Sequence, residues 1–216
     1  MEVFGDHWTD HFDRIAGDWR SRVAEDDLVL IPGDISWAMH LSDALNDLYA
    51  IDDLPGHKVI LRGNHDYWWH SISRVRSAIP RRMSAIQNDC MCFPDVLIAG
   101  TRGWNLPESD GDAASLKIYE RELIRLQMTL SAARGISDTL PLVVMMHFPP
   151  LTLNRQATGF TDLLEYYHAA HVVYGHLHGS ALSGAFRGIL RGVHYHQVSC
   201  DGLLFKLYEL PMHALA

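Results

Sequence analysis

The sequence is poor in cysteine, and it lacks any apolar run long enough to cross a bilayer. Its three cysteines, Cys90, Cys92 and Cys200, form an odd and sparse set. Such a set does not build a disulfide framework and is more typical of reduced thiols in a cytoplasm. The sequence also lacks the basic and then apolar segments of a secretory signal. These absences predict a cytoplasmic protein that does not enter a membrane.

Positive charge is scarce as well. The 216 residues include 18 Lys and Arg but 26 Asp and Glu, which gives a formal net charge of −8. A surface of this sign repels phosphate backbones and argues against general nucleic-acid binding through a basic face. Hydrophobic residues make up 48% and charged residues 20%, as is usual for a globular protein. The length suits one domain with a well-buried core, so we expect residues 1–216 to form a single domain.

Four apolar segments end in loops that are rich in His, Asp and Asn, and they read as buried strands followed by polar loops. The segments are LVLIPGD (28–34), KVILRGNHD (58–66), PLVVMMHFPP (141–150) and HVVYGHLHG (171–179). Helical periodicity covers the ranges 9–24, 41–53, 70–78 and 112–134. Further strands are expected near 84–87, near 95–99 and within 189–210. Strands that alternate with helices and are followed by more strands predict a layered α/β fold.

The polar side chains of the four loops are expected to meet, because ligands of open α/β sheets gather at the carboxyl ends of the strands. The loops offer Asp34, Asn64, His65, Asp66, His147, His176 and His178. Carboxylate and amide oxygens with imidazoles, and no thiolate, suit divalent first-row ions such as manganese, iron, zinc or nickel. One carboxylate can also bridge two ions ~3.5–4 Å apart, an arrangement that stabilises both oxygens of a phosphoryl displacement.

Taken alone, each of these residues has a simpler interpretation. His147 after an apolar strand would be a core histidine, and Asn64 would be a turn residue. Asp66 would cap the helix at 70–78. For Trp68 and Trp69 the simpler interpretation is packing in the core, which is the more typical role of large aromatic residues. The functional alternative is that they stack on an aromatic substrate.

Other polar residues are less informative. Arg62 lies within a strand pattern, so we expect it to point away from the rim rather than bind a phosphate. Cys90 and Cys92 lack a second pair at zinc-site spacing, which argues against metal binding there. His194 and His196 alternate along a predicted strand and so share one face. A solvated face is the simpler interpretation of this pair, and a place at the rim of the site is the alternative.

The ordered motifs G-D, G-N-H-D, H and G-H-x-H resemble those of the calcineurin-like metallophosphoesterase superfamily. The longer strings PGDISWAM and RGNHDYWW are similar to a bacterial branch of predicted phosphohydrolases. The resemblance implies a two-sheet β-sandwich flanked by helices, with two metal ions at the strand ends. It implies that Asp34 bridges the ions and that His178 belongs to the second ion. The remaining ligands of the first ion would be Asn64, His147 and His176.

The resemblance also implies a mechanism. His65 would be the catalytic histidine, which protonates the leaving oxygen or stabilises its charge, and Asp66 would orient the His65 ring. A metal-bound hydroxide would attack phosphorus in line. The string GDISWAM lacks the arginine that follows the second motif of protein serine/threonine phosphatases. We therefore expect a small phosphorylated substrate, namely a phosphomonoester, a phosphodiester or a nucleotide.

The superfamily's first strand, which ends in D-x-H, has no counterpart ahead of PGDISWAM. Asp6-His7 and Asp10-His11 are adjacent pairs, and we expect them to lead into the first helix. On this basis the second ion keeps only two ligands and is weakly held. A mis-assigned start codon is the leading explanation and a true truncation is the second. An edge left by a missing strand would favour a homo-oligomer.

Two functions of different classes follow from these observations. The first is a metal-dependent phosphoesterase that uses Mn²⁺ in preference to iron, zinc or nickel. The second is a non-catalytic protein that binds one metal ion. A structural zinc site is a third interpretation, which the oxygen-rich ligand set disfavours.

Overall fold

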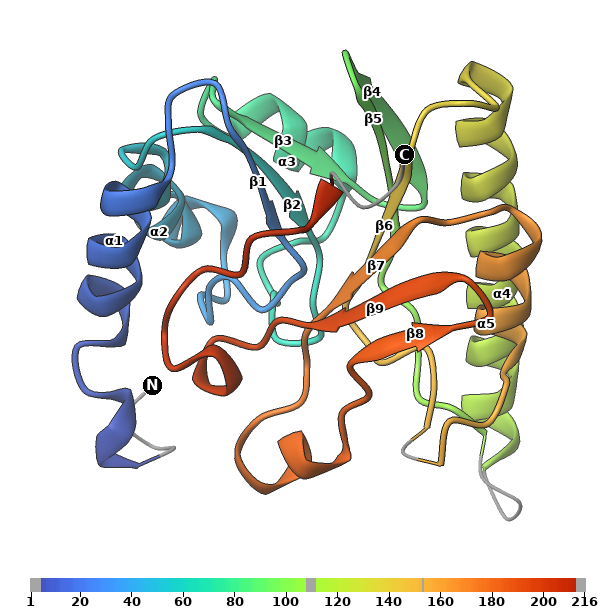
Figure 1. Ribbon diagram of the computed structural model, residues 1–216. Coiled ribbons are helices and arrows are strands. Elements are labelled where there is room, and N and C mark those ends of the chain that lie inside the picture. Colours follow the sequence, from blue (N-terminus) through green and yellow to red (C-terminus); the bar gives the residue numbers. More distant parts are fainter. Residues whose placement is uncertain (1–4, 108–111, 153, 213–216) are drawn as a thin grey trace.

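The protein is a sandwich of two β-sheets with helices on both outer sides (Figure 1). The computed structural model describes residues 5–107, 112–152 and 154–212. One sheet has three parallel strands in the order β1 (Leu28–Ile31), β2 (His57–Leu61) and β3 (Met83–Ile86). The other has six strands in the order β4 (Asp89–Phe93), β5 (Val96–Thr101), β6 (Leu142–Met146), β7 (His171–Tyr174), β9 (Val193–Gln197) and β8 (Gly188–Leu190). The predicted two-sheet α/β architecture is confirmed.

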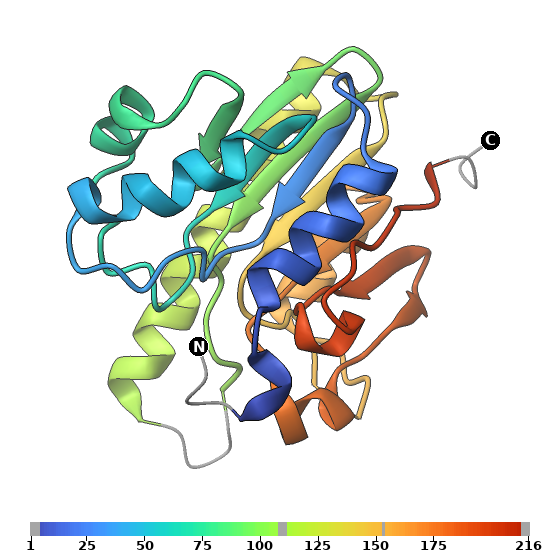
Figure 2. The same ribbon diagram turned by 90° about the vertical axis from the view of Figure 1, so that its left-hand side faces the viewer.

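The helices cover the outer faces of the two sheets (Figures 1 and 2). The three-stranded sheet carries α1 (His11–Arg22), α2 (Leu41–Asp52) and α3 (Ile72–Ala78), and the six-stranded sheet carries α4 (Ala113–Ile136) and α5 (Gly159–Tyr166). Short 3-10 helices are η2 (Asp6–Trp8), η3 (Gly179–Gly184) and η4 (Asp201–Leu203). Within the described ranges, no helix is long and apolar enough to span a membrane.

The alternation of side chains along the strands explains how both faces are buried. In β2, Val59 and Leu61 point between the sheets and contact strands of the six-stranded sheet. Ile60 points the other way and packs with α2 and α3. Because both faces of the central strands are covered, these strands read as continuous apolar runs in the sequence. The four apolar runs that carry the motifs are β1, β2, β6 and β7.

Most predicted elements are present, and the differences have local causes. The helices predicted at 9–24, 41–53, 70–78 and 112–134 correspond to α1, α2, α3 and α4. Two short elements were not predicted: β4 forms a half-exposed hairpin with β5, and the two-turn α5 begins at a Thr158–Thr161 capping box. The strands expected within 189–210 are β8 and β9, which pair as an antiparallel hairpin. The prediction of strand beyond Gln197 is wrong, because η4 follows and Leu204 and Phe205 adopt positive φ angles of 56° and 59°.

Candidate metal centre

The loops after β1 and β2 approach each other so closely that only glycine fits at two positions. A Cβ on Gly63 would lie 2.1 Å from Oδ1 of Asp34, and a Cβ on Gly33 would lie 2.6 Å from the Gly63 nitrogen. Gly33 also has a φ of 95°, and Asp34 itself is left-handed at 57°. Glycine and, less often, Asp or Asn tolerate this conformation. The two loops thus bring Asp34 against the loop that carries Asn64.

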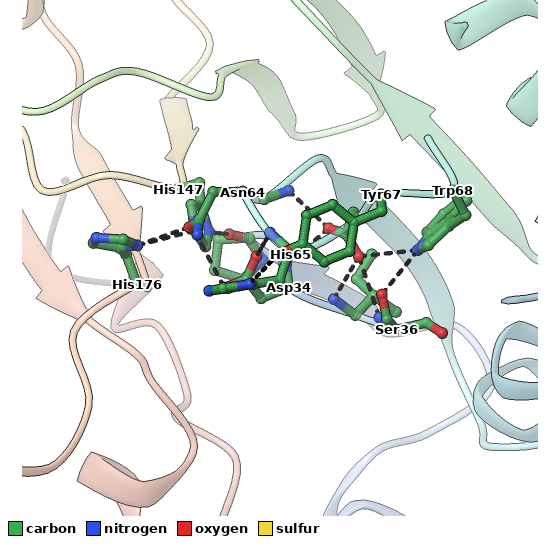
Figure 3. A network of polar contacts seen from close by, with 12 residues as sticks. Asp34, Ser36, Asn64, His65, Tyr67, Trp68, His147 and His176 are labelled. Carbon is green, nitrogen blue, oxygen red and sulfur yellow. Dashed lines mark hydrogen bonds and ion pairs between the residues drawn. The ribbon is translucent and has the colours of Figure 1, made fainter. Parts of the chain in front are cut away.

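Four side chains from four different loops converge at this point (Figure 3). Oδ1 of Asn64 lies 2.6 Å from Nε2 of His147 and 2.9 Å from Nδ1 of His176. Nε2 of His147 lies 3.4 Å from a carboxylate oxygen of Asp34 and 3.3 Å from Nδ1 of His176. Ligands of one ion at about 2.1 Å in tetrahedral geometry are about 3.4 Å apart, so this spacing fits a single ion. The structure therefore brings together the four residues predicted for the first ion, and their role as ligands stays a prediction.

The environment of His147 explains why its side chain suits a metal ion. The ring is fully buried, and its Nδ1 donates to the carbonyl of Pro32 at 2.9 Å. With the proton on Nδ1, the lone pair of Nε2 faces the carboxylate of Asp34 and the amide oxygen of Asn64. Burial lowers the pKa of His147 to about 4 against the opposing charge of Asp34, so the ring is neutral at pH 7. Nε2 of His147, the carboxylate of Asp34 and the amide oxygen of Asn64 are then three acceptors that face one another, an arrangement that a cation stabilises.

The predicted contact between Asp66 and the His65 ring is wrong. Asp66 is fully buried, and its carboxylate accepts the backbone N–H groups of Asp34, Ile35, Ser36 and Gly63 and the indole N–H of Trp68. Burial raises the pKa of the Asp66 carboxyl, and the N–H donors oppose that shift. The alternative role as a helix cap is also wrong, because the N-cap residue of α3 is Ser71 and no side chain caps that end of the helix. Asp66 joins the two ligand-bearing loops through their backbones.

His65 is held by two aromatic residues that the sequence analysis missed. Its Nδ1 lies 3.0 Å from the hydroxyl of Tyr67, and its ring stacks on Trp37 with the centroids 5.2 Å apart. Trp37 and Tyr67 are 41% and 43% exposed, whereas Trp68 and Trp69 are buried. The packing interpretation of Trp68 and Trp69 is therefore confirmed. Trp37 and Tyr67 stand inside the two motif loops, which is the one signal that pointed to them.

His178 lies outside the group formed by Asp34, His147 and His176. Its Nδ1 is 2.8 Å from the carboxylate of Asp201, which also accepts the backbone N–H of Gly179. Asp201 belongs to η4, in the segment that the sequence analysis assigned to a strand, so its partnership with His178 was not predicted. A carboxylate behind a histidine fixes the ring orientation, as it does for many metal ligands. The assignment of His178 to a second ion stays a prediction.

The Asp-His pairs near the start of the sequence lead into α1, as predicted. Asp6 and His7 lie in η2, and His11 is the first residue of α1 with its Nδ1 3.0 Å from the carbonyl oxygen of Trp8. Trp8 is buried and lies 5.5 Å from the His178 ring. Among the described residues, neither His7 nor His11 belongs to a group that could hold a metal ion.

Two arginines, Arg102 and Arg62, lie near the ligand-bearing segments. The carbonyl of Arg102 accepts the N–H groups of His147 and Phe148, and its guanidinium lies 5.0 Å from the centre of the Trp104 ring. The Arg102 charge lowers the pKa of His147 further. Nε of Arg62 is buried without a hydrogen-bond partner in the part of the chain that the structure describes. The site thus combines ligand atoms with nearby cationic side chains.

Comparison with known proteins identifies the family of this chain. The model of the calcineurin-like phosphoesterase family matches residues 3–180, so the chain belongs to this family of metal-dependent phosphoesterases, which bind divalent ions. No curated protein matches the chain. Among solved structures, it is similar to the phosphopantetheinyl hydrolase PptH from Mycobacterium tuberculosis, with 16% identity and a TM-score of 0.49 over 81% of this chain and 79% of that one.

Proposed function

We propose that this protein hydrolyses a small phosphomonoester, phosphodiester or nucleotide with a divalent ion held by Asp34, Asn64, His147 and His176. The observation that carries the proposal is the convergence of these four side chains, in which each has a polar atom within 2.6 to 3.4 Å of at least one of the others. A divalent ion bound there would polarise a phosphoryl oxygen and stabilise charge in the transition state. The mixed oxygen and nitrogen donors suit Mn²⁺ first and iron, zinc or nickel next.

His65 is the proposed general acid. The Tyr67 hydroxyl engages its Nδ1, so Nε2 is the nitrogen available to protonate the leaving oxygen. Stacking on Trp37 restricts the orientation of the ring. Both aromatic neighbours are half-exposed, and they offer apolar surface to the organic part of a substrate.

The positive charge of Arg102 would favour the binding of an anionic substrate. This charge acts on His147 against the larger effect of the Asp34 carboxylate, so it would partly offset the negative charge that an incoming phosphate meets. Arg102 adjoins the metal-ligand group, because its carbonyl accepts the backbone N–H of His147. The substrate is therefore expected to place its phosphate between them.

A non-catalytic protein that binds one ion is the second candidate. The observation that favours it is the position of His178, whose Nδ1 contacts Asp201 and which stands apart from the Asp34 group. A second ion would then lack a compact set of ligands among the described residues. This candidate predicts metal binding at Asp34 and His176 without turnover.

An assay with two synthetic substrates separates the candidates. Bis-p-nitrophenyl phosphate and p-nitrophenyl phosphate are incubated with the protein and Mn²⁺, with and without a chelator. We expect hydrolysis that the chelator abolishes, that His147→Ala lowers about 100-fold or more, and that the control His40→Ala leaves unchanged, because His40 is exposed at the start of α2. Turnover that resists both the chelator and His147→Ala would refute the phosphoesterase. Metal binding without any turnover would favour the second candidate.

A further inference from the structure

A second group of histidines lies at the other end of β7, away from the site described above. His171 begins β7, whereas His176 follows its end, and the strand between His171 and Tyr174 spans roughly 10 Å. In the parallel ladder His171 pairs with His194 of β9, and Val173 pairs with His196. The three imidazoles therefore project from the same face of the six-stranded sheet, the face on which Val173 contacts the other sheet.

The three rings are close enough to share an ion. Nδ1 of His171 lies 3.0 Å from Nε2 of His196, and one nitrogen from each of the three residues lies within 4.8 Å of the others. The ring centroids of His171 are 5.1 Å from those of His194 and 5.2 Å from those of His196. Two imidazole nitrogens bound to one tetrahedral ion stand about 3.4 Å apart, so little rearrangement separates the observed spacing from that of a ligand set.

The side chains of His171 and His196 are buried, so these two histidines do not form a solvated face. His171 is fully buried, and its Nε2 has no hydrogen-bond partner in the described part of the chain. His196 is 9% exposed, so the solvated-face interpretation of this histidine is wrong. Burial lowers the pKa of His171, and burial together with the His171 charge lowers the pKa of His196 to about 4. His171 and His196 are therefore neutral at pH 7, which is the state that binds metal ions.

The contact of His196 with Tyr208 is compatible with the tautomer that a metal site requires. Nδ1 of His196 lies 3.1 Å from the hydroxyl oxygen of Tyr208. When Nδ1 carries the proton and donates it to this oxygen, Nε2 presents its lone pair toward His171. Ligating histidines in metalloproteins are oriented by such a bond from their second nitrogen.

An open pocket adjoins the cluster. A cavity of about 230 Å³ is lined by His194 and His196 together with Tyr208, Gln197 and Arg187. Arg187 is held by Oε1 of Gln197 at 2.6 Å, so its guanidinium stays on the wall of the pocket. An ion bound by the three imidazoles would keep one position facing this pocket. Three protein ligands and one exchangeable position are the arrangement of reactive zinc sites.

We propose that His171, His194 and His196 form a second metal site that binds Zn²⁺ or a similar imidazole-preferring ion and leaves one coordination position open to the pocket. The ligand atoms of this second site differ from those of the first site, and the difference determines which metal ion each site prefers. The first site includes the oxygen atoms of Asp34 and Asn64, which Mn²⁺ accepts readily, whereas the second offers nitrogen alone. The second site is therefore selective for Zn²⁺ over Mn²⁺.

The test counts bound zinc on the full chain. Metal-depleted protein is equilibrated with Zn²⁺, desalted, and analysed by inductively coupled plasma mass spectrometry. We expect His194→Gln to lose one equivalent of zinc while phosphoesterase turnover is retained, and His176→Ala to keep the equivalent that His194→Gln loses. The control His40→Gln removes an exposed imidazole and should keep the full zinc content. Tyr208→Phe should weaken zinc binding about 10-fold without removing a ligand.

Cobalt provides a readout that does not depend on activity. Co²⁺ bound by the three imidazoles should give visible absorption bands typical of tetrahedral coordination, and His176→Ala, which disrupts the first site, should keep these bands whereas the double variant His176→Ala with His194→Gln should lose them. A zinc content and a cobalt spectrum that are the same in His194→Gln and in the wild type would overturn the proposal. His194 is only half-buried, so this variant decides the outcome even if His171→Gln does not fold. Failure here leaves the phosphoesterase proposal standing, because that proposal depends on Asp34 and His147.

Discussion

The carboxylate of Asp66 accepts the backbone N–H of Asp34 at 2.8 Å, although 32 residues separate them in the chain. The same oxygen accepts the N–H of Gly63 at 2.7 Å. One buried side chain thus fixes the relative position of the two loops that carry Asp34 and Asn64. The role of Asp66 is to position these loops, while His65 is held by Tyr67 and Trp37.

Replacing Asp66 should lower stability and metal affinity together. In Asp66→Asn an amide NH₂ faces backbone donors that the carboxylate now satisfies, and hydrogen bonds to a charged group contribute ~1.5–3 kcal/mol each. We expect the free energy of unfolding in guanidinium chloride to fall by about 3 kcal/mol. The control Asp26→Asn removes an exposed carboxylate from a turn and should leave stability within about 0.5 kcal/mol of the wild type. Unchanged stability with a loss of turnover alone would instead restore a direct catalytic role for Asp66.

His65 should affect turnover and not metal content. His65→Ala removes the proposed proton donor, so we expect kcat to fall about 100-fold or more while the bound metal and the melting temperature stay as in the wild type. Tyr67→Phe removes the hydroxyl that engages Nδ1 and should shift the pH profile of kcat with a smaller loss of rate. Loss of bound metal in His65→Ala would show that His65 is a ligand.

Gly63 should be irreplaceable even by alanine. The added Cβ would lie 2.1 Å from Oδ1 and 2.3 Å from the nitrogen of Asp34, so the Asp34 loop would have to move. We expect Gly63→Ala to lose metal affinity and turnover together. Gly135→Ala is the matched control, because a Cβ there meets no atom within 4 Å, and alanine in α4 should stabilise the protein by about 0.5–1 kcal/mol. Wild-type metal affinity in Gly63→Ala would contradict the packing of the two loops.

Acid should destabilise the metal-free protein through His147. Its pKa is about 4 in the folded state and 6.5 in the reference state, so the unfolded chain binds the extra proton between these values. Stability therefore falls as the pH drops from about 6.5 to about 4, and one pKa unit corresponds to about 1.4 kcal/mol, which gives a contribution of about 3 kcal/mol. Guanidinium unfolding at several pH values should show a flatter pH dependence for His147→Gln than for the wild type. Equal slopes would contradict the burial of a neutral ring.

The ligand group could be predicted from the sequence because the same local pattern, an apolar strand followed by a polar residue, occurs four times. Asp34, Asn64, His147 and His176 each follow an apolar strand, and parallel strands present their carboxyl ends at a common edge. The role of Asp66 escaped prediction because its partners are backbone N–H groups, which every residue type carries. Asp201 escaped because it follows β9 while His178 follows β7, and only the parallel pairing of these two strands brings their ends together.

The histidines of β7 and β9 also show what could not be predicted from the sequence. Alternation along the strand placed His194 and His196 on one face but could not reveal His171 beside them. Strand pairing is a property of the whole chain, and the order β7-β9-β8 is set by the packing of the sheets. Burial of these side chains likewise follows from tertiary structure, so only the structure shows that His196 is not solvated.

A titration of the metal-depleted protein with Mn²⁺ tests the central claim most directly. Bound metal and hydrolysis of bis-p-nitrophenyl phosphate are measured on the same samples of the wild type, His147→Ala and His40→Ala. The two quantities should rise together in the wild type and in His40→Ala, and both should be lost in His147→Ala. Turnover at the full rate before metal is added, or turnover that persists in His147→Ala, would contradict a phosphoesterase centred on Asp34, Asn64, His147 and His176.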